Sequence, residues 1–250
     1  MPSGQTGPGP RVPRPLWSFR AVGAVVGAIT LVLLLVFGAQ LLDRSSFEST
    51  TLAGPVTRVD IRLARGNVDL VPAVAESADV VVERTSRWRF SQPSLTAEVL
   101  PDSGVARIDA TCPRVVLVVG ICRVDYLVQV PAGLRVDVRT DSGTVTFEGL
   151  DGWVRVVTSD GAVAGTNLST QEVLVDSQGG AVSLGFSGSP SRILVLSGGG
   201  SIDIQTPGGP FQVRASGGKG ERTIDVPVEP DAERTITLDS GNGDVTVTSR

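Results

Sequence analysis

The chain has 250 residues, no histidine, and 22 basic against 26 acidic side chains, which gives a net charge of −4. Residues 1–42 contain three arginines and no acid, so residues 43–250 hold 19 basic and 26 acidic side chains, a net charge of −7. The lack of histidine excludes Ser-His-Asp and Cys-His catalysis and the usual zinc sites. The acidic remainder predicts no nucleic-acid partner, because such proteins hold phosphates with dense basic side chains.

The N-terminal segment is rich in proline and glycine. Residues 1–15, MPSGQTGPGPRVPRP, contain five prolines and three glycines. A segment of this composition cannot bury enough apolar surface to fold. We therefore expect residues 1–20 to form a disordered tail.

Residues 21–42, AVGAVVGAITLVLLLVFGAQLL, form an apolar run without a charge. An α-helix rises about 1.5 Å per residue, so about 20 apolar residues span a hydrocarbon core. The run predicts a single transmembrane helix. A cleaved signal peptide is the alternative, but it would have a shorter apolar region and a small residue where Phe37 stands. The three arginines on the N-terminal side predict that residues 1–20 are cytoplasmic and that the rest lies outside the cell membrane.

After a short linker at 43–48, residues 49–250 predict an all-β domain. Val59, Ile61 and Leu63 alternate with polar residues, and the same alternation recurs at 135–139, 235–238 and 245–248. A period of two places one row of side chains in a core and the other in water.

Short glycine-rich turns separate the strands at nearly regular intervals. The apolar residues that follow four successive turns, at an almost constant step, are Val145, Val163, Val182 and Ile202. A step of roughly 20 residues is typical of repeat architectures, whose stacked units share one core. We expect glycine to supply a positive φ in each turn, with Asp, Asn and Ser closing the corner. The glycines given this structural role are Gly66, Gly143, Gly161, Gly180, Gly199, Gly218 and Gly243.

Two arrangements fit this pattern: a parallel β-solenoid with about one coil per repeat, or an antiparallel β-sandwich of hairpins. Even spacing and glycine-rich corners favour the solenoid, although short connections fit either arrangement. Residues 74–130 are less regular and predict longer strands that lead into the repeats.

Cys112 and Cys122 are the two cysteines of the chain. If the domain lies outside the cell, the space is oxidising and an even count predicts one disulfide that closes a short loop. A redox switch is the alternative. Metal ligation by two cysteines without histidine is not expected.

Residues 126–168 resemble the bacterial putative-adhesin family of β-strand-repeat domains. The resemblance rests on the upstream cysteine pair, Tyr126, VPAG at 130–133, and Ser-Gly turns with EGLDG between them. It extends over roughly 49–250 and does not include the apolar run. It implies a β-repeat fold and a cell-envelope setting, and it implies no catalytic residue.

Five aspartates stand at turn corners, where they could bind calcium, form the carboxylate pair of a glycosidase, or cap the turns. The calcium-binding repeat G-G-x-G-x-D is not reproduced, so we expect caps and no metal, cofactor or catalytic residue. RWRF at 87–90 is a candidate for contact with sugar or an anionic polymer, and a strand with its aromatics inward is the simpler interpretation. The aspartates are Asp141, Asp160, Asp176, Asp239 and Asp244.

Together these features predict a non-enzymatic, single-pass envelope protein. Its β-repeat domain would serve adhesion, or interaction with a cell-wall polymer or an envelope protein. The first alternative is an accessory protein in envelope-stress sensing or signalling, which would report through the helix to residues 1–20. The second alternative is a carbohydrate-active solenoid enzyme.

Overall fold

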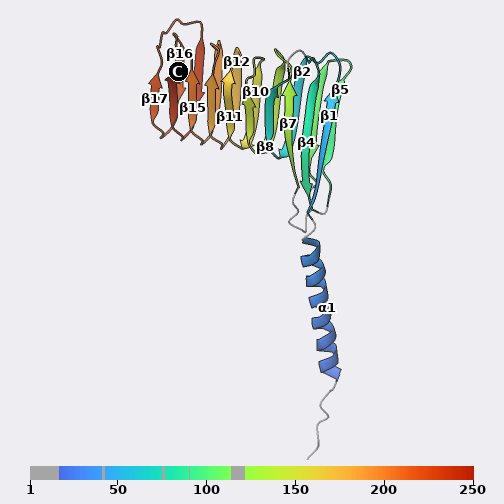
Figure 1. Ribbon diagram of the computed structural model, residues 1–250. Helices are drawn as coiled ribbons and strands as arrows, with labels where there is room; N and C mark the ends of the chain where they lie inside the picture. Colours follow the sequence, from blue (N-terminus) through green and yellow to red (C-terminus); the bar gives the residue numbers. More distant parts are fainter. Residues whose placement is uncertain (1–16, 41–42, 75–76, 90, 114–121) are drawn as a thin grey trace, which may run out of the picture. The chain divides into compact units, whose positions relative to one another are not determined.

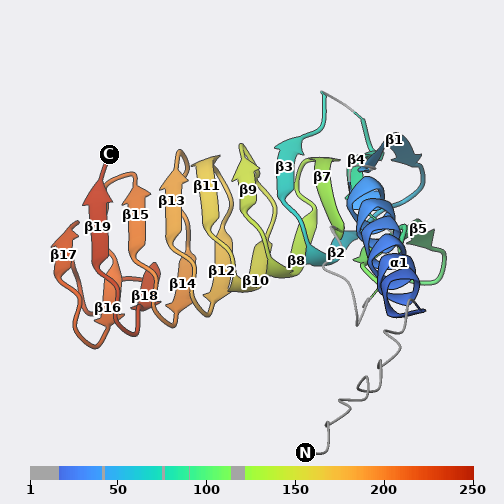
Figure 2. The same cartoon turned by 90° about the horizontal axis from the view of Figure 1, so that it is seen from below.

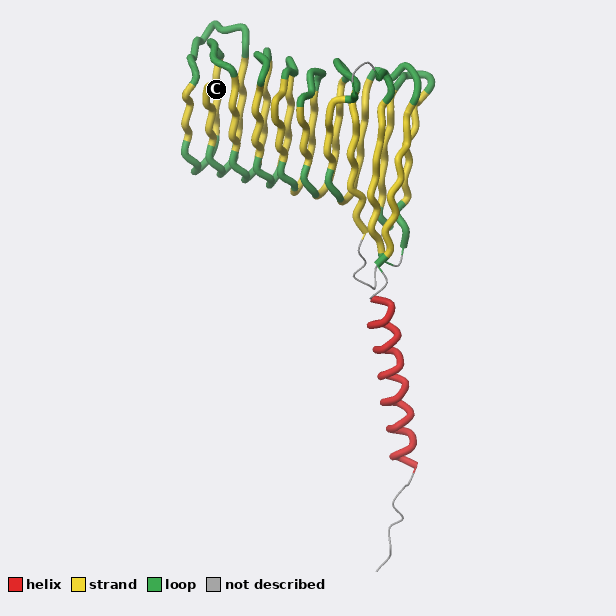
Figure 3. Tube along the Cα trace, viewed as in Figure 1, coloured by secondary structure: helices red, strands yellow, loops and turns green. Residues whose placement is uncertain are grey.

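The computed structural model describes residues 17–40, 43–74, 77–89, 91–113 and 122–250. The chain divides into two compact units, Met1–Asp43 and Arg44–Arg250. The described part of the first unit contains one helix, α1 (Trp17–Gln40), and that of the second unit is built from strands (Figure 3).

Helix α1 covers most of the predicted apolar run. The Thr30 hydroxyl donates to the Val26 carbonyl at 2.8 Å, so this polar group is satisfied within the helix. All its described side chains, at 23–36 and 38, are exposed. Among the described residues, no helix is both long enough and apolar enough to cross a membrane. Residues 41–42 of the predicted span and 1–16 of the predicted tail lie outside the described residues.

The second unit begins directly with a strand at Arg44, so the predicted linker at 43–48 is wrong from that residue on. Residues 44–52 pair antiparallel with 80–88 along their whole length, which draws the expected linker into a sheet. The strands are β1 (Arg44–Leu52), β2 (Arg58–Arg65), β3 (Val68–Pro72), β4 (Val80–Trp88), β5 (Ser94–Leu100), β6 (Val105–Thr111), β7 (Cys122–Val130), β8 (Arg135–Ser142), β9 (Val145–Glu148), β10 (Val154–Asp160), β11 (Val163–Leu168), β12 (Glu172–Ser177), β13 (Val182–Phe186), β14 (Arg192–Ser197), β15 (Ile202–Thr206), β16 (Gln212–Ser216), β17 (Arg222–Asp225), β18 (Thr235–Asp239) and β19 (Val245–Ser249).

These strands form two large sheets that face each other (Figures 1 and 2). Sheet A has the order β1-β4-β7-β3-β9-β11-β13-β15-β19-β17, and sheet B has the order β16-β18-β14-β12-β10-β8-β2-β6-β5. From β8 to β19 successive strands alternate between the sheets, so each strand–corner–strand unit contributes one strand to each. The predicted repeat step is confirmed in sheet A, where Val145, Val163, Val182 and Ile202 are in-register neighbours.

The strand pairs of the repeat region are parallel, which does not fit an antiparallel sandwich of hairpins. Among the described strands, antiparallel pairing is confined to β1 with β4, β4 with β7, and β5 with β6. The glycine turns therefore connect strands of opposite sheets instead of neighbours in one sheet. The longer strands expected from the less regular stretch at 74–130 are the 9-residue β4 and β7.

At each end of the sheets, chain order and spatial order differ. The pair β18 and β19 lies between the pair β14 and β15 and the pair β16 and β17, although it follows both in sequence. Likewise β2 and β3 lie between β8 and β9 on one side and β6 and β7 on the other. At the C-terminal end the outermost strands are thus β16 and β17 and not the last two strands of the sequence, whereas at the other end β1 is outermost in sheet A and β5 in sheet B.

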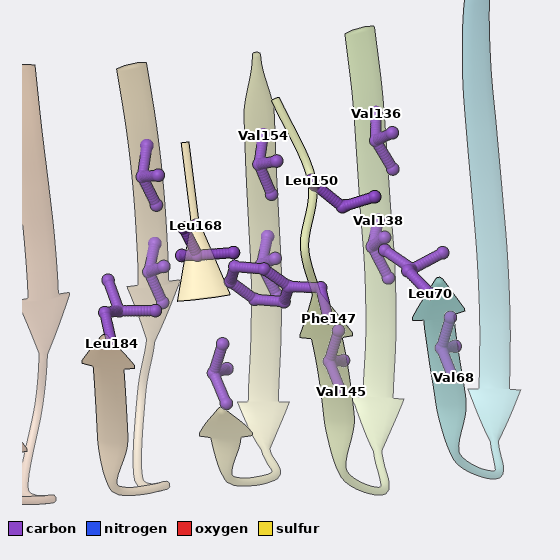
Figure 4. Close-up of a cluster of buried hydrophobic side chains, with 14 of the residues drawn as sticks. Val68, Leu70, Val136, Val138, Val145, Phe147, Leu150, Val154, Leu168 and Leu184 are labelled. Atoms are coloured by element: carbon purple, nitrogen blue, oxygen red, sulfur yellow. The ribbon is translucent and has the colours of Figure 1, made fainter. Parts of the chain in front are cut away.

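The core lies between the two sheets and consists mainly of valine, leucine and isoleucine. In-register rows such as Val136 and Val154 in sheet B face Val145 and Phe147 in sheet A (Figure 4). Because each unit presents only a few small side chains, no unit could bury its apolar face alone. Stacking makes the core continuous, and this agrees with the low aromatic content of the chain.

One corner of every unit contains a stacked glycine. A Cβ atom built on Gly180 would lie within 3.0 Å of the carbonyl oxygen and carbon of Gly161 and of the Ala162 nitrogen. At this corner, the same obstruction by the neighbouring unit's backbone connects seven glycines in one row, which we call the glycine column. Its members, in spatial order, are Gly66, Gly143, Gly161, Gly180, Gly200, Gly243 and Gly220.

The expected positive φ explains only the start of this column. It is found at Gly66 (142°) and Gly143 (126°), whereas the later members need glycine because a neighbouring carbonyl occupies the Cβ position. Gly199 does not belong to the column, since nothing lies within 4 Å of its Cβ position. Gly218 faces the carbonyl of Gly241 and belongs to a second column with fewer members, which also contains Gly198 and Gly241.

Buried serines close the later corners, as predicted. The Ser197 hydroxyl accepts from the Gly200 nitrogen at 3.0 Å and donates to the Gly200 carbonyl at 2.9 Å. Ser177 makes the same two hydrogen bonds with Gly180. Each corner therefore satisfies its polar groups locally, which allows it to pack against its neighbour without water.

Candidate binding face on sheet B

A cluster of arginines stands on the outer face of sheet B. Strands β2 and β8 both contain the sequence Arg-Val-Asp-x-Arg, at 58–62 and 135–139, and they are in-register neighbours. The valines point into the core, so the charged residues of both strands lie side by side on the outer face. Arg107 of β6 is in register with Asp60, and Arg155 of β10 with Asp137. We call the resulting set the arginine ring: Arg58, Arg62, Arg107, Arg135, Arg139 and Arg155.

Two carboxylates, Asp60 and Asp137, lie at the centre of this ring. Their exposed fractions are 3% and 4%, and they occupy opposing positions on β2 and β8. Asp60 accepts from Arg62 at 2.8 Å and lies 3.6 Å from Arg139. Asp137 accepts from Arg135 at 3.1 Å and lies 3.8 Å from Arg58.

These contacts explain how two like charges can be buried next to each other. Each acid has one arginine on its own strand and one on the neighbouring strand, which offsets both the desolvation of the carboxylate and the repulsion between the pair. The hydrogen bond with Asp60 raises the pKa of Arg62, with a smaller contribution from Asp109. Both acids therefore serve to fix the guanidinium groups through ion pairs and hydrogen bonds.

The ring carries more positive charge than these two acids neutralise. Six guanidinium groups surround two central carboxylates, and Glu98 and Asp109 lie in register with Arg107 and Arg62 on the β5–β6 side. Among the described residues, Arg107 and Arg155 form no ion pair. The buried Nε atoms of Arg58, Arg107 and Arg155 have no hydrogen-bond partner. The face thus carries more guanidinium groups than carboxylates, in a domain whose overall charge is negative.

The surroundings of the ring on the β10 side are apolar and aromatic. The guanidinium carbon of Arg135 lies 3.6 Å from the centroid of the Trp153 ring, a cation–π contact. Val157 and Leu174 follow on the outer face at β10 and β12, both half-buried. An arginine stacked on an aromatic ring is held in place, so its remaining donors are preorganised toward the solvent.

The predicted disulfide between Cys112 and Cys122 is present. The two Cα atoms are 5.8 Å apart, and the cysteines are separated by 10 residues. The bond connects the residue after β6 in sheet B to the first residue of β7 in sheet A. It therefore links the two sheets at the end of β6 and the start of β7.

The corner aspartates cap turns where their contacts are described. Asp244 accepts from the Glu221 nitrogen at 2.9 Å, and Asp239 from the Gly241 nitrogen at 3.2 Å. Asp176 and Asp239 also border a shallow hollow of about 370 Å³ around Leu196, over β12, β14 and β18. Within the described ranges, no group of three or more His, Cys, Asp or Glu side chains could hold a metal ion. Asp141 and Asp160 are exposed at their corners.

The basic and aromatic stretch at 87–90 does not form part of the ring. Arg87 at the end of β4 is exposed, while Trp88 and Arg89 are half-buried, and Phe90 lies outside the described residues. Strand β4 belongs to sheet A, so this stretch and the arginine ring are on different sheets.

A buried polar side chain lies inside the end of the domain formed by β1, β4 and β7. Tyr126 of β7 is 1% exposed, and its register partner Arg84 forms an ion pair with Glu48 at 2.5 Å. Burial raises the pKa of Tyr126 to about 12, although nearby Arg84 acts in the opposite direction.

The chain matches no family model, and no curated protein matches it. Among solved structures, it is similar to a "putative cell adhesion protein" from Clostridium sporogenes ATCC 15579, with 12% identity and a TM-score of 0.47 over 83% of this chain and 100% of that chain. A second similar structure is a "putative lipid binding protein" from Parabacteroides distasonis ATCC 8503, with 11% identity and a TM-score of 0.25 over 82% of this chain and 96% of that chain. At these values the two likenesses do not assign a function.

Proposed function

We propose that the protein is a non-catalytic envelope protein that binds a component of the cell envelope through the outer face of sheet B. One observation carries the proposal: six arginines gather on one face of a domain whose net charge is negative. Two buried acids and a stacked tryptophan hold four of these arginines in place. Preorganised charge of this kind favours recognition of a partner of opposite charge.

The burial and ion pairs of the two central acids support the proposal of a non-catalytic role. A carboxylate that acts as general acid or base needs a pKa near the working pH and access to the substrate. Asp60 and Asp137 are buried, and each is covered by contacts with two arginines, which leaves a substrate no access to them. They are suited to fixing guanidinium groups and not to transferring protons.

The alternation of strands between two parallel sheets supports a β-solenoid as the finer description of the domain. A solenoid offers a long, flat and rigid sheet face, on which side chains recur at the strand spacing of about 4.8 Å. Such a face suits an extended partner better than a small molecule, which needs a concave pocket.

Attachment to the membrane through residues 21–42 is part of the same proposal. The exposed aliphatic side chains of α1, such as Leu33, Leu34 and Leu35, need an apolar environment. Three arginines before the run support a cytoplasmic N-terminus, and the disulfide fits an oxidising space outside. Protease treatment of intact spheroplasts should degrade the β-domain and leave a membrane-bound N-terminal fragment. A β-domain that is protected in intact spheroplasts would contradict this orientation.

Binding is tested by co-sedimentation of the full-length protein, in nonionic detergent, with isolated cell-wall material. We expect pelleting at low salt that decreases as salt is raised, because exposed charge pairs are screened. Protein that stays in the supernatant at low salt would refute binding to the wall.

A further inference from the structure

The arginine ring has properties that narrow the chemistry of its partner. Not every arginine of the ring has a carboxylate partner. The two central acids form ion pairs with four of the arginines, whereas Arg107 and Arg155 form none among the described residues. The buried Nε donors of Arg58, Arg107 and Arg155 lack acceptors. Because those Nε atoms are covered, they do not themselves reach a ligand; the guanidinium groups of the half-buried Arg107 and Arg155, which lack a carboxylate partner, favour a ligand that brings anionic oxygens.

The shape of the face excludes a small anion as the natural occupant. The ring spreads over the four adjacent strands β6, β2, β8 and β10, which is about 14 Å at the usual strand spacing. The described hollow lies elsewhere, over β12, β14 and β18. An isolated anion would contact few of the arginines, whereas a linear polymer with an acidic group on each repeat would contact several along its length.

The composition of the face favours a glycan over a nucleic acid. Proteins that bind single-stranded nucleic acid stack successive bases on several aromatic side chains, and their basic groove follows the backbone. Here one aromatic ring, Trp153, lies beside the arginine ring, and the Arg135 guanidinium already covers a face of it.

We propose that the arginine ring binds an acidic polysaccharide lying across strands β6, β2, β8 and β10, an inference that rests on the proposed function. Arg107, Asp60, Asp137 and Arg155 form one in-register row across the four strands. Arg107 and Arg155, at the two ends of this row, supply the unpaired guanidinium groups. Asp60 and Asp137 act as positioning residues that hold the remaining four arginines. Carboxylate and phosphate groups both match the guanidinium fork, so the acidic group is to be identified by experiment.

The test uses full-length protein in nonionic detergent and four probes: carboxymethyl-dextran, phosphate-substituted dextran, unmodified dextran and single-stranded DNA of similar length. The ring variant carries Arg107→Gln and Arg155→Gln, which leaves the four arginines around the central acids unchanged. The matched control carries Arg192→Gln and Arg214→Gln, two exposed arginines of β14 and β16 in the same sheet. Both variants should show the melting temperature of the wild type.

We expect the wild type and the control to bind at least one acidic dextran with affinities within about twofold of each other, and unmodified dextran weakly. The ring variant should bind at least about tenfold more weakly, with a smaller dependence on salt. Whether the carboxylate or the phosphate probe binds more tightly identifies the acidic group. Equal binding by ring variant and wild type, no binding to either acidic dextran, or equally tight binding of DNA would each overturn the inference.

Wall pelleting separates this inference from the proposed function. If wild type and ring variant pellet equally with wall material, the function stands and the arginine ring is not the site. If the wild type stays in solution while the ring binds acidic dextran, the chemistry of the face stands and the wall is not its partner.

Discussion

The glycine column gives the sharpest prediction about stability, which is the effect of Gly180→Ala. The new Cβ would lie within 3.0 Å of two atoms of Gly161 and of the Ala162 nitrogen, where ordinary contact needs 3.4–4 Å. Backbone atoms cannot move aside as a flexible side chain can. The corner after β12 must therefore separate from the corner after β10.

The magnitude follows from the contacts that this separation stretches. Gln178 donates to the Thr158 carbonyl at 3.1 Å, and Val163 to the Ala181 carbonyl at 2.9 Å, on either side of Gly180. Loss of two such hydrogen bonds costs about 1 kcal/mol each, and overpacking adds about 1–3 kcal/mol. We expect the free energy of unfolding to fall by about 4 kcal/mol, and the melting temperature by about 10 °C.

The matched control is Gly199→Ala, because nothing lies within 4 Å of the Cβ position of Gly199. That variant should change the free energy of unfolding by less than about 1 kcal/mol, and removal of a glycine could even stabilise. Urea and thermal denaturation followed by far-UV circular dichroism measure both variants. A loss below about 1 kcal/mol for Gly180→Ala, or equal losses for the two variants, would refute the role of the column.

Two further predictions concern the end of the domain formed by β1, β4 and β7. Tyr126 has a pKa of about 12 when folded and about 10 when unfolded, so its contribution to stability is complete below pH 10 and is lost as the pH rises toward 12. The loss should approach about 3 kcal/mol in urea titrations, and Tyr126→Phe should remove this pH dependence; an unchanged slope in the variant would contradict the assignment. Replacing Cys112 and Cys122 by serine should lower the free energy of unfolding by roughly 3 kcal/mol, because a closed loop of about 10 residues constrains the unfolded chain. The same loss should follow when the wild type is reduced, and a reduced protein as stable as the oxidised one would show that the bond does not support the fold.

Local pattern was sufficient to predict the strands and the repeat. The alternation at Val59, Ile61 and Leu63 indicates a strand that is buried on one face. The step from Val145 to Val163 corresponds to one repeat of the stack. Both properties depend on residues close in sequence, so they are visible without knowing which strands pair. The disulfide followed from the cysteine count and the expected compartment.

The arginine ring could not be assembled from the same pattern, because it depends on which strands become neighbours. Arg58 and Arg135 are far apart in sequence, and β3 to β7 intervene between their strands. The repeated Arg-Val-Asp-x-Arg was the available signal, since identical segments in parallel and in register place like residues side by side. The run of three glycines at 198–200 presents a similar difficulty: only the packing of the neighbouring corners shows that the Cβ positions of Gly198 and Gly200 are obstructed and that of Gly199 is open.

The position of β18 and β19 has a consequence for how the domain is completed. In a simple linear array, the last unit of the chain is the outermost, and it can unfold or be removed without disturbing the others. Here residues 235–249 separate β16 and β17 from the rest of the sheets, so residues 212–225 have no partner strands until the later segment is in place. During synthesis, which begins at the N-terminus, residues 212–225 are made before 235–249. They must therefore stay unpaired until the later segment has been made. The far end of the domain then closes in one cooperative step that joins both segments.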